Sequence, residues 1–347
     1  MEAKNQTHRR QPLVEVINEL VLVLNDKEKR VISGRFGLLG KKETLSAIGK
    51  ELKRSRERIR QIEKNALKKL AKRFTNEEQN QKEKILAVFE KSGGVVVEND
   101  LPIELLKLAG GNKLAKNYLI LVLTIVKGVA KINGSDDLKN SWRIESLSEE
   151  KIIGVCRKMV SYFNREKLAG DIDDIAARVE GFKRYQSNFI NACVNVSNKL
   201  ARAKNGLIGL KSWPTINPRN VRDKIYYVLK NSGKPLHFTR IAAEIIAMKF
   251  DLKKVVRATI HNELIADKRF VLIGRGIYAL REWGYSDGTV YDVIKNLLEN
   301  SKKPMPIKEI IDLVSKSRRV KINTIVINLQ TKREFKRVAG GYVFRKL

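Results

Sequence analysis

Apolar residues recur every three or four positions in four consecutive segments near the N-terminus, and this spacing predicts four amphipathic helices. The expected helices cover residues 12–24, 25–38, 44–52 and 55–70. Asn25 or Asp26 is a suitable N-cap for the second helix, and Ser55 is suitable for the fourth. The apolar stripe of the fourth helix, which should face a core, consists of Ile59, Ile62, Ala66 and Leu70.

A longer pattern follows residue 77, with a period close to 70 residues. Trp142, Trp213 and Trp283 are spaced by 71 and 70 residues, and a new amphipathic helix follows each of them. The last two repeats run from two helices through a third helical segment to two short strands around a glycine turn. Three helices followed by a β-hairpin form the winged-helix pattern, a variant of helix-turn-helix. The sequence therefore predicts a mainly α chain of tandem helix-turn-helix and winged-helix modules with short β-hairpin wings. The alternative is four helical modules without shared ancestry.

These patterns also predict where the modules begin and end. The expected parts are a flexible tail (1–11), a helix-turn-helix module (12–76) and four winged-helix units (78–146, 147–216, 217–285 and 286–347). In the third unit, Thr239 is expected to cap the second helix, and the third helix is expected at 252–265. His237 and His261 are expected to cap or pack.

The charge of the chain narrows the choice of partners. Among 347 residues, 70 Lys and Arg stand against 38 Asp and Glu, a formal net charge of +32. Binding to a polyanion relieves self-repulsion on this scale. Nucleic acid is the first candidate partner, and an anionic membrane surface is the second. The longest apolar run, 119–126, is too short to span a bilayer. Two isolated cysteines, Cys156 and Cys193, indicate a reducing and therefore cytoplasmic compartment.

The polar face of segment 55–70 suits a DNA groove. A recognition helix places its N-terminal residues on base edges, where Arg suits guanine, Gln suits adenine and Glu accepts from cytosine. The candidate base-reading residues are Arg56, Glu57, Arg60 and Gln61. The candidate phosphate contacts are Lys53, Arg54, Ser55, Arg58, Lys64 and Lys68. Residues 41–73 hold thirteen Lys or Arg and four Glu, which favours a DNA-binding helix over the alternative of a solvated surface helix.

A resemblance to region 4 of bacterial sigma-70 family factors is carried by RVISGRFGL and then ETLSAIGKELKRSRERIRQIEKNALKKL, at about residues 21–73. In that family, region 4 is a helix-turn-helix that reads the −35 promoter element and docks on RNA polymerase. The resemblance implies base-edge contacts by the four candidates above, with double-stranded DNA and core RNA polymerase as partners. Only about 20 residues precede it, too few for regions 2 and 3, which bind polymerase and melt the −10 element. We therefore expect a promoter reader without the promoter-melting regions.

A second resemblance, to HARE-type helix-turn-helix domains, is carried by GKPLHFTRIAAEI and then RFVLIGRGIYALREWGY, at about residues 218–285. That family includes the N-terminal domain of the RNA polymerase delta subunit. In a winged helix the third helix enters the groove and the wing touches the backbone, while many winged helices bind proteins instead. The candidate DNA contacts of the last two units are Lys253, Lys254, Arg257, His261, Arg275, Lys321, Asn323, and Lys336 or Arg337.

No catalytic constellation stands out in the sequence. The three histidines are far apart, and the glycines of GRFGLLGKKE lack the spacing of a phosphate loop. We expect a protein that is not an enzyme, with no cofactor, metal site, small-molecule substrate or membrane partner. The expected function is sequence-specific DNA binding in bacterial-type transcription, at the nucleoid. Two alternatives stay open: a delta-like RNA polymerase accessory subunit and a non-specific architectural nucleoid protein.

Overall fold

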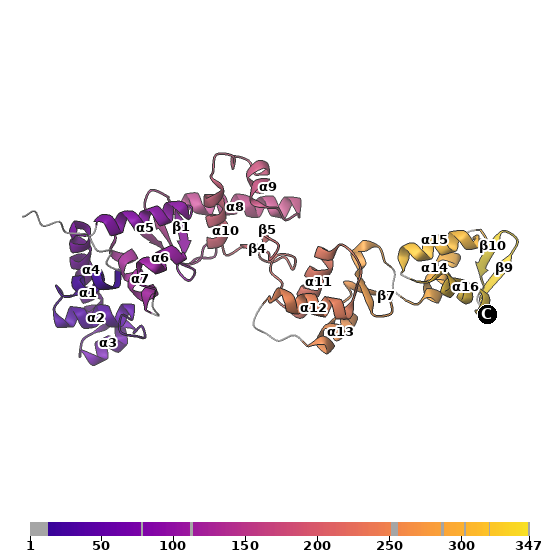
Figure 1. Cartoon of the computed structure of the whole chain (residues 1–347), viewed down its shortest axis with the longest axis horizontal. Coiled ribbons are helices and arrows are strands. Elements are labelled where there is room, and N and C mark those ends of the chain that lie inside the picture. The colour runs from indigo at the N-terminus through magenta and orange to yellow at the C-terminus, as the bar shows by residue number, and fades with distance from the viewer. Residues whose placement is uncertain are drawn as a thin grey trace, which may run out of the picture. The chain divides into compact units, whose positions relative to one another are not determined.

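The computed structural model describes residues 13–77, 79–111, 114–250, 256–285, 288–301, 303–318 and 320–345. These residues form sixteen α-helices, one 3-10 helix and ten short strands in antiparallel pairs (Figure 1), which confirms the mainly α fold class with short β-hairpins. The chain divides into two compact units, one ending at residue 210 and the other starting at 211, apart from residues 203–205, which group with the second. Within the described ranges, no helix is long and apolar enough to cross a membrane.

The N-terminal helices begin and end where the sequence supplies caps. They are α1 (Leu13–Val21), α2 (Asp26–Phe36), α3 (Leu45–Glu51) and α4 (Arg56–Glu77). Asn25 caps α2: its side chain accepts the Glu28 N–H at 2.9 Å, and the Glu28 carboxylate accepts the Asn25 N–H at 3.1 Å. Gly37 ends α2 in the left-handed conformation. The Ser55 hydroxyl oxygen accepts the Arg58 N–H at 3.2 Å, so Ser55 caps α4 as expected.

Residues 79–144 form three helices and a three-stranded sheet of order β1-β3-β2. The elements are α5 (Gln79–Lys91), β1 (Val95–Val97), α6 (Ile103–Leu108), α7 (Ala115–Ile125), β2 (Val129–Ile132) and β3 (Ser141–Ile144). Helix α7 is almost entirely buried and packs against α1, α2 and α4. The Asn117 side chain donates to the Gly37 carbonyl oxygen at 2.9 Å, which joins α7 to the end of α2. One apolar core therefore extends from Leu13 to Trp142.

The first unit continues with a second group of helices that ends in a hairpin. The elements are α8 (Glu149–Glu166), α9 (Ile172–Arg178), α10 (Ser187–Val196), β4 (Leu200–Arg202) and β5 (Ile208–Leu210). Helix α10 packs against β1, and the Asn188 side chain donates to the Glu90 carbonyl oxygen at 3.2 Å. The third helix of this group is thus packed against the preceding sheet.

The second unit opens with the third group of helices. Its elements are α11 (Val221–Ser232), β6 (Leu236–His237), α12 (Phe238–Met248), α13 (Arg257–Ala266), β7 (Phe270–Gly274), β8 (Ile277–Leu280) and the 3-10 helix η1 (Arg281–Trp283). The expectation that Thr239 caps α12 is wrong, because β6 ends at His237 and the helix starts directly after it. The His237 ring nitrogen accepts the Thr239 N–H at 3.3 Å, so His237 is the N-cap.

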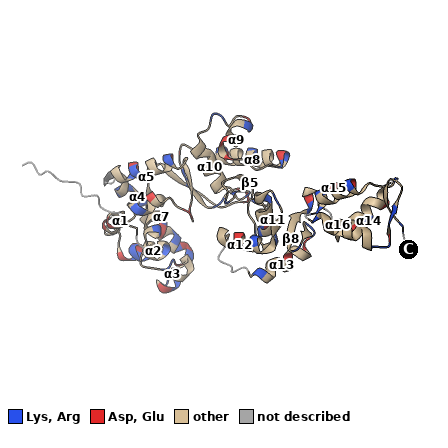
Figure 2. Ribbon diagram, turned by 45° about the vertical axis from the view of Figure 1, so that its right-hand side comes forward, with Lys and Arg blue, Asp and Glu red and all other residues tan. Residues whose placement is uncertain are grey.

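The last group has the same order of three helices followed by a hairpin. It consists of α14 (Val290–Asn300), α15 (Ile307–Ser317), α16 (Ile322–Thr331), β9 (Phe335–Val338) and β10 (Gly341–Phe344). Ile325 and Leu329 of α16 are buried with Phe335 and Tyr342 of the hairpin in the core of this group. The module boundaries predicted from the sequence stay a prediction. Figure 2 shows that Lys and Arg residues occur on elements of both units.

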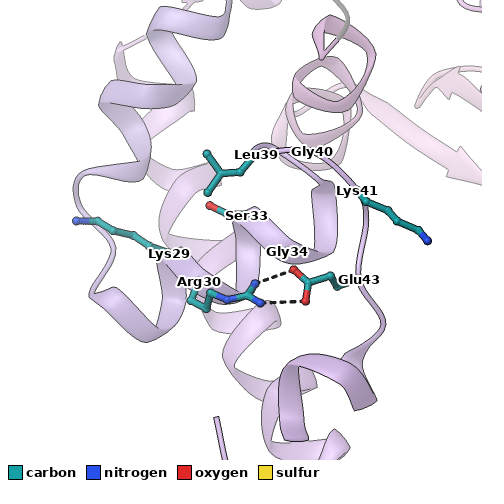
Figure 3. Close-up of a pocket in the computed structure, with 8 residues that line it drawn as sticks. All are labelled: Lys29, Arg30, Ser33, Gly34, Leu39, Gly40, Lys41 and Glu43. Carbon is teal, nitrogen blue, oxygen red and sulfur yellow. Dashed lines mark hydrogen bonds and ion pairs between the residues drawn. The ribbon is translucent and has the colours of Figure 1, made fainter. Parts of the chain in front are cut away.

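Ion pairs fix α2 to the two helices that follow it. The Arg30 guanidinium donates to both oxygens of Glu43 at 2.9 Å, and it also pairs with Glu51 at the end of α3. Arg35 pairs with Glu63 of α4 at 3.1 Å. A cavity of about 390 Å³ lies beside this network (Figure 3). Because the Arg30 guanidinium is already held by two carboxylates, it is not free to receive an anion there.

The turn between α3 and α4 requires a glycine. A Cβ on Gly49 would lie 2.7 Å from the Arg54 carbonyl oxygen, and the Arg54 N–H donates to the Gly49 carbonyl oxygen at 2.8 Å. We predict that Gly49→Ala destabilises this helix pair by about 1–3 kcal/mol, because the added methyl group overpacks the turn. The loss should appear as faster amide hydrogen exchange in α3 and α4.

A matched control for Gly49→Ala lies in α8. Gly154 is in the helix interior, and an added Cβ would meet nothing within 4 Å apart from its chain neighbours and the backbone of its own helix. Gly154→Ala should therefore stabilise α8 by about 0.5–1 kcal/mol. Equal exchange rates in wild type and Gly49→Ala would contradict the close packing of this turn.

The Arg30 network predicts a dependence on pH. Hydrogen bonds from Arg30 hold the pKa of the Glu43 carboxyl below its usual value. The stabilisation by this pair is therefore fully present above the ordinary carboxyl pKa of roughly 4.3, and it is lost as the pH falls through the lowered pKa. In Arg30→Met, α2 and α3 should exchange faster at neutral pH and lose less protection on acidification. Arg165→Met, which removes an exposed pair with Glu166 on α8, is the control. Identical pH profiles for wild type and Arg30→Met would contradict this role.

Candidate nucleic-acid interface

The two faces of α4 have different environments. Ile59 is fully buried with Val31 and Ile48 in the core that joins α2, α3 and α4. Further along α4, Ala66, Leu70 and Phe74 are buried in the larger core with α1 and α7. Side chains on the opposite face of the helix are left in solvent. This orientation is the one expected from the apolar stripe in the sequence, although Ile62 of that stripe is only half-buried.

The four candidate base-reading residues are all exposed in the first two turns of α4. Glu57 accepts two hydrogen bonds from Arg60 at 2.7 and 2.8 Å, and Gln61 accepts one from Arg58 at 3.1 Å. Hydrogen bonding by Arg60 lowers the pKa of the Glu57 carboxyl, which is therefore ionised near neutral pH. Exposed pairs of this kind contribute little stability, so they can open when a better partner arrives.

The candidate phosphate contacts surround this group. All six are exposed, and Lys64 and Lys68 lie one and two turns beyond Arg60 on the same face of α4. Lys53 and Arg54 lie in the turn before the helix, where Lys53 has a positive φ of 49°. The Ser55 hydroxyl oxygen accepts the Arg58 N–H as the cap of α4. The O–H of the same hydroxyl can still donate to a phosphate oxygen. The N-terminal half of α4 therefore presents polar side chains with cations before and after them.

The fold also brings together cations that the sequence pattern does not reveal. Lys42, before α3, lies near Lys116 of α7 and Lys131 of β2. Burial lowers the pKa of the Lys42 ammonium, Glu98 opposes this, and the neighbouring cations and Arg35 lower it further. Lys131 pairs with Glu98 at 2.9 Å. No helical or strand spacing connects these positions, because they meet only through the packing of α7 on α2.

The candidate contacts of the second unit lie at helix starts and hairpins. Arg257 and Lys321 lie at the starts of α13 and α16, and Arg275 lies in the turn between β7 and β8; all three are exposed. Asn323, Lys336 and Arg337 are exposed as well. Lys253 and Lys254 lie outside the described residues. His261 contacts the rings of Phe238 and Tyr278, so it packs as expected.

The His, Cys, Asp and Glu residues that the structure describes are its possible metal ligands. No group of three or more His, Cys, Asp or Glu residues could hold a metal ion among those residues. Cys156 and Cys193 are free and buried, and hydrogen bonding with Cys156, together with burial, raises the pKa of the Cys193 thiol.

Comparison with known protein families matches two segments of the chain. Residues 21–72 match the family described as Sigma-70, region 4. Residues 220–283 match the HARE-HTH family, whose description includes ASXL and a restriction endonuclease HTH domain. Both are families of DNA-binding domains and not of enzymes. The first match contains α2, α3 and residues 56–72 of α4, and the second runs from α11 to η1.

Similar curated proteins share the first of these segments. RNA polymerase sigma factor RpoD of Helicobacter pylori is 51% identical over 63 residues, covering 18% of this chain and 9% of the relative. RNA polymerase sigma factor SigA of Lactococcus lactis is 49% identical over 59 residues, covering 17% and 16%. RNA polymerase sigma-K factor of Bacillus subtilis is 42% identical over 72 residues, covering 20% and 24%. The chain thus spans at most about a quarter of the length of these relatives.

The two matched segments lie in different units of the fold, the first in the first unit and the second in the second unit. The matched families and the sigma-factor relatives together support a DNA-binding role related to transcription. Residues 21–72 are thus similar to Sigma-70 region 4, and residues 220–283 are similar to HARE-HTH domains.

Proposed function

We propose that this protein binds DNA in a sequence-specific manner in bacterial-type transcription, with α4 as the reader of a promoter element. The observation that supports this most is the set of four exposed side chains in the first two turns of α4, inside the region 4 domain. Their helix is held from behind by two apolar cores. The matched segment covers region 4 alone, so the proposal is limited to promoter reading and does not include promoter melting.

The chemistry of each side chain suggests its role in the major groove. Arg56 and Arg60 carry guanidinium groups that suit guanine, Gln61 suits adenine, and Glu57 can accept from the amino group of cytosine. Because Glu57 and Arg60 are paired in the free protein, DNA binding would exchange this pair for contacts with bases. The six candidate phosphate contacts would fix the register of α4 on the duplex.

RNA polymerase core is the proposed protein partner, at the nucleoid in the cytoplasm. The sigma-factor relatives support this partner by their names. The apolar faces of α1, α4 and α7 are buried against one another, so a polymerase contact would use exposed residues of this module. The second unit would add phosphate contacts through Arg257, Arg275 and the last hairpin.

The base-reading role predicts the outcome of a binding selection from random duplexes at near-physiological salt. Wild type should enrich a short motif, and Arg56→Ala/Gln61→Ala should lose it while keeping non-specific affinity. Each lost bidentate contact should reduce discrimination by about 1–3 kcal/mol. The control is Arg165→Ala/Gln79→Ala, which removes an exposed Arg and an exposed Gln from other helices and should keep the motif.

Two outcomes of this selection would overturn the proposal. If wild type binds tightly but enriches nothing, the protein is a non-specific architectural binder. If DNA binding is weak and the chain captures core polymerase without DNA, it is an accessory subunit of the delta type. A motif that survives Arg56→Ala/Gln61→Ala would move base reading away from α4.

The proposed phosphate contacts predict how affinity for duplex DNA depends on salt, which is a second, independent test. Affinity for duplex DNA should fall steeply between about 50 and 200 mM salt, because each neutralised phosphate releases counterions. Lys64→Ala/Lys68→Ala should weaken binding to all sequences alike and reduce the slope of log affinity against log salt by about 2. Fluorescence anisotropy titrations give this slope. Affinity that does not change with salt would contradict phosphate binding by this protein.

A further inference from the structure

The third helices of the four groups that follow α4 have different surroundings. In the first unit, α7 packs against α1, α2 and α4, and α10 packs against β1 of the preceding sheet. In the second unit, α13 packs against α11, α12 and β7, and α16 packs against α14, α15 and β9, all elements of their own groups. The outer faces of α7 and α10 are therefore covered by other elements of the first unit, while those of α13 and α16 are exposed.

The exposed face of α16 carries no charge. Asn323, Ile327 and Gln330 follow one another at spacings of four and three, so they form one stripe along the helix. Ile327 is 55% exposed, and Ile322 beside the stripe is 56% exposed. The opposite side of α16 is anchored by the buried Ile325 and Leu329. The exposed stripe of α16 therefore consists of one isoleucine, Ile327, between two amides, with Ile322 beside it.

Cations border this uncharged face. Residues 321–345 contain six Lys or Arg and one acidic residue, Glu334. Glu334 accepts a hydrogen bond from Tyr291 at 3.3 Å, so it faces the core side of the group. The exposed cations next to α16 and on β9 are Lys321, Arg333, Lys336 and Arg337, while the Lys332 ammonium lies 5.9 Å from the centroid of the Tyr291 ring. A neutral stripe with positive charge at its ends and on the adjacent hairpin complements a groove bordered by phosphates.

We propose that α16 is a second base-reading helix, which enters the major groove of duplex DNA and selects A·T base pairs. The amides of Asn323 and Gln330 suit the edge of adenine, and Ile327 suits the methyl group of thymine. The stripe lacks the Arg or Lys that guanine favours and the Glu or Asp that cytosine favours. This inference rests on the proposed function for its occupant, duplex DNA, and extends it to a helix outside both matched domains.

The test is a random-duplex selection with the full chain and three variants. Wild type should enrich two blocks, one of them rich in A·T. Asn323→Ala/Gln330→Ala should lose the A·T block and keep the other, with discrimination reduced about 5- to 150-fold for each lost bidentate contact. Arg56→Ala/Gln61→Ala should do the reverse. Asn300→Ala, an exposed amide at the end of α14, is the control and should keep both blocks.

Thymine-to-uracil substitution in the A·T block tests the role of Ile327 without changing any hydrogen bond. Wild type should bind the uracil duplex about fourfold more weakly, because one methyl contact is lost. Ile327→Ala should bind both duplexes alike. The side chain is half exposed, so the variant is expected to fold, and circular dichroism checks this.

The outcomes separate this inference from the proposed function. If the α4-dependent block appears without an A·T block, the inference fails and the proposed function stands. If only the A·T block appears, α4 reading fails and the inference stands. If neither appears, both fail. If Asn323→Ala/Gln330→Ala keeps both blocks but captures less core polymerase, the face of α16 is a protein-docking surface and the inference is overturned.

Discussion

Helix α4 is held by two separate apolar cores, and the candidate interface depends on this. Its 22 residues extend about 33 Å, long enough for its first half to complete the core with α2 and α3 and its second half to enter the core with α1 and α7. Because the second half of α4 is buried in the larger core, the helix is held in place. The side chains of its first turns therefore project from a rigid support. A base-reading site needs this rigidity, because groups on a fixed helix lose less entropy on binding than groups on a loop.

Ion pairs join α2 to α3 and α4 in addition to the packing of the two cores. Arg30 and Arg35 on α2 reach the loop before α3, the end of α3 and the middle of α4. Lys69 reaches back from α4 to the nearly buried Glu28 at 2.8 Å, so α2 and α4 are linked at both ends of their contact. These contacts favour one alignment of α2 along α3 and α4, in addition to the packing of the apolar cores.

Local features could be predicted from the sequence, and long-range contacts could not. Asn25, Ser55 and the stripe through Ile59 act within one or two helical turns, so their spacing reveals them. Arg30 and Glu51 are 21 residues apart, and Asn117 and Gly37 are 80 apart. No periodic pattern connects such positions. The capping error at Thr239 has the same origin, because the start of α12 is set by the pairing of β6 with β8.

The packing partners of α7 are seen in the structure and could not be predicted from the sequence. The sequence predicts a winged-helix unit over residues 78–146, and α7 is the third of the three helices that the structure places at 79–144. Its outer face, however, is buried against α1, α2 and α4, so the unit supports the region 4 domain from behind. Groups of three helices followed by a hairpin therefore differ in the surface that they leave exposed. The difference lies in which face of the third helix remains exposed.

Base reading by the first turns of α4 can be tested by coupling one side chain to one base pair. Affinities of wild type and Gln61→Ala would be measured for duplexes with all four base pairs at each position of the enriched motif. We expect Gln61→Ala to lose discrimination at a single position, where adenine is preferred, and to keep it at the others. Uniform weakening at every position would show that Gln61 contacts the backbone and that α4 does not read a base with this side chain.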